Sequence, residues 1–296
     1  MFEGLSLLEI VLEIVLINLY WLVRHILRHV AVPIKKHAAL LLWCALTILC
    51  ARGPRPALAG PPFVTDDPEP VDYQHWEFYI ASQDSKIKGD WSGTAPHFEV
   101  NYGAVPDLQL HLIVPLAYDS PPQGAAHYGI GDIELGAKYR FMQETNGLPQ
   151  MGIFPLLEAP SDSSRDNLGN GHCQAFLPLW VQKSWGSWTA YGGGGYGINS
   201  FSGRQNWGFA GAVLQKQVLT NLLVGVEVYH QTVLETDFPN VGTAFNVGAV
   251  FDFSEQHHLL FSAGRSISGP AQFQCYIAYQ FTFDNSLFQL GNKPGH

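Results

Sequence analysis

The sequence predicts an all-β protein: a transmembrane antiparallel up-and-down β-barrel of about twelve strands, preceded by an N-terminal signal segment. Three observations predict it: apolar–polar alternation in segments of about ten residues, turn signals between these segments, and a shortage of charge. The 296 residues are 47% hydrophobic and 13% aromatic but only 14% charged. Soluble domains carry about 25% charged residues, so this chain has too few charges for an ordinary water-facing surface.

Residues 1–59 predict an export signal. A basic patch at 35–37 precedes the apolar run 38–51, which is too short to span a bilayer comfortably, and residues 57–59 are Ala-Leu-Ala. We therefore expect cleavage after Ala59 and location in the cell outer membrane. The upstream residues 1–31 leave three interpretations open: a membrane-surface helix, a first transmembrane helix, or translation from a misassigned start codon.

The remaining chain divides into an N-terminal periplasmic segment or plug (60–73), the barrel (74–283) and a C-terminal tail (284–296). No stretch sustains a helical period. Pro155 and Pro178 weaken two of the predicted strands, because proline cannot donate to a ladder. The strands are predicted at about 74–84, 94–104, 106–118, 130–143, 148–159, 172–184, 187–200, 206–219, 221–233, 242–254, 256–266 and 272–283.

The connections alternate between short turns and longer polar loops. The longer loops are predicted at about 85–93, 119–129, 160–171, 201–205, 234–241 and 267–271. Short turns at one end, long loops at the other and an even strand number are typical of bacterial outer-membrane barrels. Both ends of the barrel sequence then lie on the short-turn, periplasmic side.

The segment 132–141 shows which face meets which medium. One parity is apolar (Ile133, Leu135, Ala137, Tyr139, Phe141), and the other is charged apart from one glycine (Asp132, Glu134, Gly136, Lys138, Arg140). Backbone polar groups cannot stay open in hydrocarbon, so the sheet must close, with its apolar side toward lipid and its charged side toward a lumen. The alternative is a soluble exported β-sandwich or barrel with the apolar side inward. The polar parity is rich in Gly, Gln and Tyr, including the run 191–197, which favours a crowded barrel interior.

Lumen-facing charges are the candidate functional residues. They either form ion pairs that brace the barrel or line a pore and set its selectivity. About twelve strands lie between the filled eight-stranded and the open 16-stranded barrels, so we expect a narrow channel. The main candidates are Glu77, Glu99, Asp132, Glu134, Lys138, Arg140, Glu227 and Asp252, and Glu158, Lys183, Lys216 and Arg265 extend the set.

Other chemistry is weakly indicated, and we expect no catalytic residue, cofactor or metal. The Thr-Asp-Asp-Pro segment 65–68 fits a turn or a plug better than a calcium site. His257–His258 and His172–Cys173 lack zinc spacing, and the serines of 161–164 lie in a loop. Cys173 and Cys275 are expected on distant strands as free thiols. Beyond residue 59 the chain holds 10 Lys or Arg against 22 Asp or Glu, which argues against nucleic-acid binding.

The opening segment also resembles a known family. Residues 60–80, with the motif residues Pro62, Phe63, Thr65, Asp66, Asp67, Pro68 and Glu77, are similar to the "MetA-pathway of phenol degradation" family, as are 105–116 and 129–141. These are predicted outer-membrane β-barrels, often described as transporters. The resemblance covers essentially the whole chain after the signal. It implies an association with the breakdown of aromatic compounds.

The predicted function is diffusion of small, hydrophobic or aromatic molecules through an outer-membrane barrel. Expected partners are outer-membrane lipid, the small-molecule cargo and the assembly machinery, which reads a C-terminal aromatic residue; Phe283 has that place, although residues 284–296 follow it. One alternative is a non-conducting structural or adhesive barrel that acts through its long loops. A less favoured alternative is an outer-membrane hydrolase.

Overall fold

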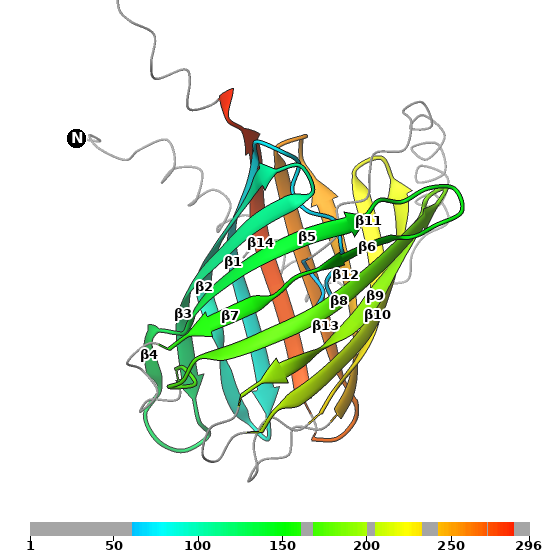
Figure 1. Cartoon of the computed structure of the whole chain (residues 1–296). Helices are drawn as coiled ribbons and strands as arrows, with labels where there is room; N and C mark the ends of the chain where they lie inside the picture. The colour runs from blue at the N-terminus through cyan, green and yellow to red at the C-terminus, as the bar shows by residue number, and fades with distance from the viewer. Residues whose placement is uncertain (1–60, 161–167, 200–204, 233–241, 271, 287–296) are drawn as a thin grey trace, which may run out of the picture. The chain divides into compact units, whose positions relative to one another are not determined.

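Over the residues that the structure describes, the fold is a closed antiparallel β-barrel of twelve strands, two of them interrupted (Figure 1). The computed structural model describes residues 61–160, 168–199, 205–232, 242–270 and 272–286. The predicted signal segment, the cleavage site, the serines of 161–164 and most of the C-terminal tail lie outside these residues. Within the described residues, no helix is both long and apolar enough to cross a membrane.

Within these described ranges, fourteen strand segments make up the twelve strands of the barrel wall. The bounds are β1 His75–Ile87, β2 Asp90–Val105, β3 Leu108–Ser120, β4 His127–Ile130, β5 Ile133–Met142, β6 Gln150–Ile153, β7 Leu156–Ala159, β8 Gln174–Trp185, β9 Trp188–Ile198, β10 Trp207–Leu219, β11 Leu222–Gln231, β12 Gly242–Asp252, β13 His257–Ser268 and β14 Gln272–Asp284. Segments β4 and β5 both pair with β3, and β6 and β7 both pair with β8, so each couple forms one interrupted crossing. The predicted strand number is confirmed.

The seam between β1 and β14 closes the barrel. It runs from the pair His75–Asp284 to the pair Ile87–Gln272 without a register shift. The beginning of β1 and the end of β14 therefore lie together at the end of the barrel that carries the short turns. One predicted long loop, 85–93, is wrong: the strands extend to Ile87 and from Asp90, and only Lys88 and Gly89 connect them. Both have positive φ, 54° and 93°, which is the twist that tight hairpins need.

The alternation is the inverse of a soluble sheet. In β5, Leu135 and Tyr139 are exposed on the outer surface, whereas Lys138 is buried inside. Similarly, Gln182, Gln215, Gln280, Glu227 and Asn246 are among the most deeply buried side chains of the barrel. A water-facing barrel would bury its apolar residues and expose these polar groups. The outer face is therefore suited to lipid, and the inner face to hydrogen bonding.

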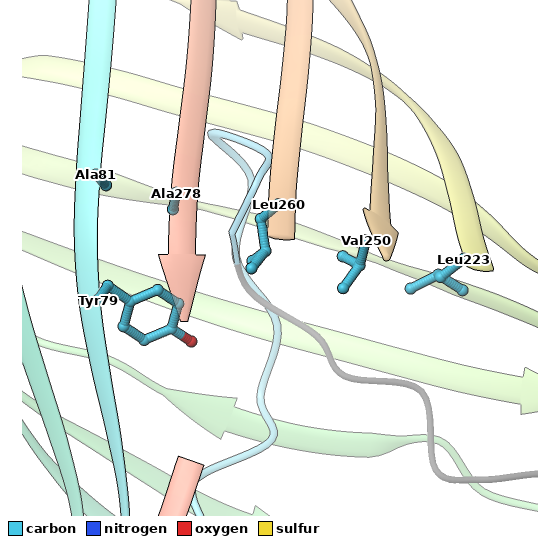
Figure 2. Packing of buried hydrophobic residues seen from close by; sticks show 6 residues of the cluster. All are labelled: Tyr79, Ala81, Leu223, Val250, Leu260 and Ala278. Carbon is cyan, nitrogen blue, oxygen red and sulfur yellow. The ribbon is translucent and has the colours of Figure 1, made fainter. Parts of the chain in front are cut away.

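Apolar side chains do enter the lumen near the short-turn end. Tyr79, Leu223, Val250 and Leu260 form a buried cluster with Ala81 and Ala278 on β1, β11, β12, β13 and β14 (Figure 2). The Tyr79 hydroxyl donates to Glu77 at 2.8 Å and accepts from Gln280 at 2.8 Å. This cluster fills the interior beside the seam.

Three charges predicted to face the lumen lie on the outward parity instead, so that prediction is wrong for Lys183, Lys216 and Arg265. Each lies near a strand end, where the outer surface leaves the apolar band and charged or aromatic groups are favourable. Lys216 lies 4.8 Å above the ring centre of Trp188. Arg265 is paired with Phe245 and Phe273 on the neighbouring strands.

A charge on the outer face tests the assignment of that face to lipid. Val247, 54% exposed, lies midway along β12. We expect Val247→Arg to lower the free energy of unfolding by about 2–4 kcal/mol in lipid vesicles, the loss found at a bilayer midplane. On a water-facing surface the change would stay within about 0.5 kcal/mol. Urea unfolding of the barrel in vesicles measures the difference.

The matched control is Ile267→Arg, an outward substitution near the rim of β13. At that height the expected loss is about 0–1 kcal/mol. Equal, small losses from both substitutions would mean that the outer face meets water.

Candidate functional site

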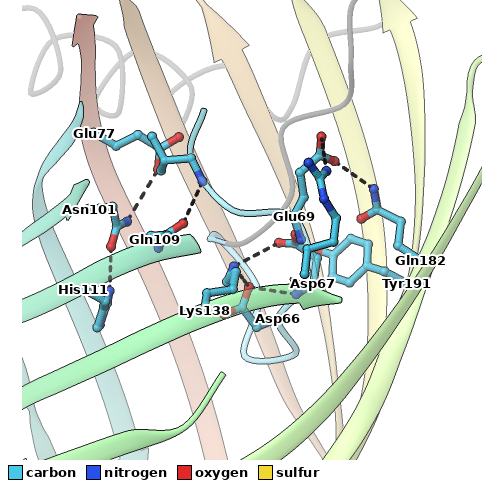
Figure 3. Close-up of polar contacts among 12 residues, drawn as sticks. Asp66, Asp67, Glu69, Glu77, Asn101, Gln109, His111, Lys138, Gln182 and Tyr191 are labelled. Atoms are coloured by element: carbon cyan, nitrogen blue, oxygen red, sulfur yellow. Dashed lines mark hydrogen bonds and ion pairs between the residues drawn. The ribbon is translucent and has the colours of Figure 1, made fainter. Parts of the chain in front are cut away.

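The segment that precedes β1 lies inside the barrel (Figure 3). Near its start, the backbone N–H groups of Val64 and Thr65 donate to the Glu227 carboxylate at 3.3 and 2.5 Å. The Ser262 hydroxyl donates to the carbonyl of Pro62 at 2.5 Å. The Phe63 ring packs against Gly225 and Gly248 of the wall, where a Cβ would lie about 3 Å from it. Residues 61–65 are thus bound to β11 and β13.

The two aspartates of this segment meet Lys138 of β5. The Lys138 ammonium lies 2.9 Å from Asp66 and 3.7 Å from Asp67, and 5.0 Å above the ring centre of Phe154. Locally, Asp67 also accepts the backbone N–H of Glu69 at 2.6 Å, as expected of an Asp turn. Complete burial raises the pKa of Asp67 well above its ordinary range, and the charge of Lys138 acts in the opposite direction.

Further along, Glu69 contacts β5, β6 and β8, on the same side of the barrel as Lys138. It accepts from Gln150 at 3.2 Å and Gln182 at 3.1 Å and lies 3.8 Å from Arg140. The Val71 N–H donates to Gln109 at 2.9 Å. All of these contacts are polar, and they tie the segment to strands around the barrel. Residues 61–74 consequently narrow the lumen from the short-turn end.

A polar network extends the site along β2, β3 and β5. Asn101 donates to Glu99 at 2.8 Å, and His111 joins Asn101 at 2.7 Å to Glu134 at 2.9 Å. Asp132 accepts the backbone N–H of Asn170 at 2.5 Å.

The candidate residues separate into three places. Glu77, Glu99, Asp132, Glu134 and Lys138 surround a lumen cavity of about 1600 Å³. Glu227 accepts hydrogen bonds from the N-terminal segment, and Arg140 lies 2.8 Å from Asp107 in the turn between β2 and β3 and 3.8 Å from Glu69. Asp252 lies at the short-turn end, 2.7 Å from His258.

The other candidate residues from the sequence do not come together in one site. His257 contacts Tyr279 rather than a group of ligands, and Cys173 and Cys275 are both free thiols. Among the described side chains, no three His, Cys, Asp or Glu residues are placed to hold a metal ion.

Sequence reasoning missed an aromatic wall inside the lumen. Phe154, Trp180, Phe209 and Tyr229 form a buried cluster, with Phe176 and Trp207 packed against it. Phe176 and Trp207 stack at 4.8 Å between ring centres. The signal was present in the sequence, because Phe176 and Trp180 share the polar parity of the strand 172–184.

The glycine run of β9 makes this wall possible. A Cβ on Gly195 would lie 2.6 Å from the Phe176 ring, and one on Gly197 would lie 2.1 Å from the Trp207 ring. Real Cβ atoms do not come so close, so the rings occupy the space that side chains would need. The crowded interior predicted from this run therefore has a specific cause, the packing of aromatic rings against its glycines.

Removing the lysine tests how the segment is held. We expect Lys138→Met to weaken its docking by about 3 kcal/mol at neutral pH, at the low end for a broken buried pair because Asp66 is partly exposed. Hydrogen exchange of the amides of residues 64–71 would become about 100-fold faster. The loss should shrink as pH falls, because protonation of Asp67, whose pKa is raised, removes the unpaired charge.

Lys216→Met is the matched control, since Lys216 lies on the outer face. It should leave exchange of residues 64–71 unchanged at every pH. The same acceleration in both variants would contradict the assigned role of Lys138.

Comparison with known proteins identifies the fold. No family model matches the chain, and no curated protein matches it. The COG4313 outer membrane channel from Pseudomonas putida F1 has a TM-score of 0.60 and 18% identity, over 76% of this chain and 100% of that one. The translocator domain of the autotransporter NalP from Neisseria meningitidis has a TM-score of 0.50 and 10% identity, over 72% and 90%. The chain has the fold of an outer-membrane β-barrel.

Proposed function

We propose that this protein is an outer-membrane channel through which small molecules diffuse, and that residues 61–74 are a plug in its lumen. The observation that carries the proposal is the polar attachment of this segment. Its N–H groups and carboxylates are held by Glu227, Lys138 and Gln182 through hydrogen bonds and ion pairs. Replacing such hydrogen bonds by hydrogen bonds to water costs a moderate free energy, whereas opening a packed apolar core costs more.

The cargo we propose is small and hydrophobic or aromatic. The resemblance to the phenol-degradation family suggested this class, and the aromatic wall of Phe154, Phe176, Trp180, Trp207 and Phe209 supports it independently. Aromatic faces hold flat apolar molecules through stacking and area burial. Membership of that family is part of the proposal.

Location follows from the inverted face pattern. We propose export through a signal peptide cleaved after Ala59, insertion by the outer-membrane assembly machinery and contact with outer-membrane lipid. The closed ladder leaves no sheet edge toward the hydrocarbon, which is the condition for a barrel to cross a bilayer.

Single-channel recording of the mature chain in planar bilayers tests the proposal. We expect small conductance steps, and a severalfold larger conductance after deletion of residues 61–71, because the segment narrows the lumen. Glu227→Ala removes the acceptor of the Val64 and Thr65 N–H groups. It should lengthen the time that the channel spends in the state of larger conductance.

Glu255→Gln, in the turn between β12 and β13, is the control and should leave the conductance unchanged. Heat-modifiable gel migration verifies that each variant is folded. A folded deletion variant that gives no steps would favour the non-conducting structural barrel and end the channel proposal.

A further inference from the structure

A second hollow lies beside the main cavity, on the wall formed by β5, β7, β8 and β10. It has a volume of about 190 Å³. Aromatic residues Phe176, Trp207 and Phe209 line it together with the carboxylates Glu134 and Glu158. A cavity of about 150 Å³ holds a benzene molecule, so this one has the size for a single aromatic ring with a small substituent.

The two carboxylates are brought together by the sheet. Glu134 of β5 and Glu158 of β7 are direct cross-strand partners. Like charges in this position repel each other. Glu158 accepts hydrogen bonds from the side chains of Asn170 and Gln174, and Glu134 is 2.9 Å from His111. These partners orient the carboxylates, and a cation between the two would relieve their repulsion.

The aromatic residues are equally fixed. Phe176 is stacked on Trp207 and meets Phe209 edge-on at 6.2 Å between ring centres. Both rings lie directly against the wall, in the space that a side chain at Gly195 or Gly197 would need. Carboxylates and aromatic rings thus line one hollow from different strands.

The lumen itself shows how this combination binds a cation. The Lys138 ammonium lies between the carboxylates of Asp66 and Asp67 and the face of the Phe154 ring. Cations are attracted to the negative face of an aromatic ring, and more strongly where water is excluded. Around the smaller hollow, the described lining residues offer the same two groups and include no Lys or Arg.

The charge of the main cavity also favours cations. Its carboxylates include Glu69, Glu77, Glu99, Asp119 and Asp132, whereas the Lys and Arg residues among its described lining are Lys88 and Lys138. A passage lined by one sign of charge concentrates ions of the opposite sign and repels those of the same sign. Anionic molecules would be disfavoured before they reached the hollow.

We infer that this hollow is a binding site for single-ring aromatic cations, with the ring against Phe176 and Trp207 and the ammonium near Glu134 and Glu158. The inference rests on the proposed function, because it names the cargo class that the passage favours. Aromatic amines and quaternary ammonium compounds are selected over aromatic carboxylates of the same size.

Equilibrium titration of the mature barrel in detergent micelles tests the site without relying on conduction. Benzyltrimethylammonium chloride is added while tryptophan fluorescence is followed, since Trp207 lies in the site. We expect a saturable change, at least tenfold weaker binding in the double variant Glu134→Gln/Glu158→Gln, and loss of most of the fluorescence response in Trp207→Leu. Sodium benzoate should give no saturable change, and Glu255→Gln should bind as the unchanged protein does.

The outcomes separate the site from the channel. Benzoate binding as tightly as benzyltrimethylammonium, or glutamine variants that bind normally, would overturn the site. The glutamine variants remove a repulsion and keep the side-chain shape, so they should fold, which heat-modifiable migration verifies. Saturable binding that the double variant weakens supports the site even where bilayer recordings show no current and the channel proposal fails.

Discussion

Closure of the backbone hydrogen-bond ladder is the constraint on which the rest of this structure depends. A sheet edge in hydrocarbon would leave a row of N–H and C=O groups unpaired, and each would cost several kcal/mol. The seam between β1 and β14 removes that edge with continuous pairing. Once the sheet is closed, alternation leaves half of each strand facing inward, where the side chains have only one another, the N-terminal segment and water as partners.

Polar side chains fill much of the space on this inward-facing half. Glutamines and glutamates such as Gln182, Gln215 and Glu227 are buried as deeply as core residues of soluble proteins. The N-terminal segment supplies backbone donors to Glu227 and carboxylates to Lys138, so the wall and the segment provide polar partners for each other. The same contacts determine how much of the lumen remains open, and structural and functional roles therefore fall on the same residues.

The sequence was sufficient to predict the architecture, because alternation with a period of two shows directly which residues share a face of the sheet. Leu135 and Tyr139 against Glu134 and Lys138 determine which side meets lipid, and turn residues locate the strand ends. A charge alone does not identify the inward parity for Lys183, Lys216 and Arg265, because each lies near a strand end, where the outer face can also carry charge. The loop 85–93 was overestimated because polar residues near the rim, where neither face is in hydrocarbon, do not distinguish loop from strand.

The site was less predictable because its partners are far apart in the chain. Asp66 and Lys138 are 72 positions apart and meet only because the segment enters the lumen. Glu134 and Glu158 become neighbours through the register of β5 and β7, which periodicity alone does not determine. The aromatic wall needed both the parity of β8 and β10 and the position of the glycines of β9 between them.

Those glycines have an effect on the other side of the barrel as well. Gly192 and Gly194 point outward and pair with Ala212 and Ala210 of β10, so this strip of the outer surface carries almost no side chains. Acyl chains can press against the main chain there. Between the hydrocarbon and the rings of Phe176 and Trp180, the wall is a single layer of peptide backbone. A β-barrel wall cannot be thinner than this.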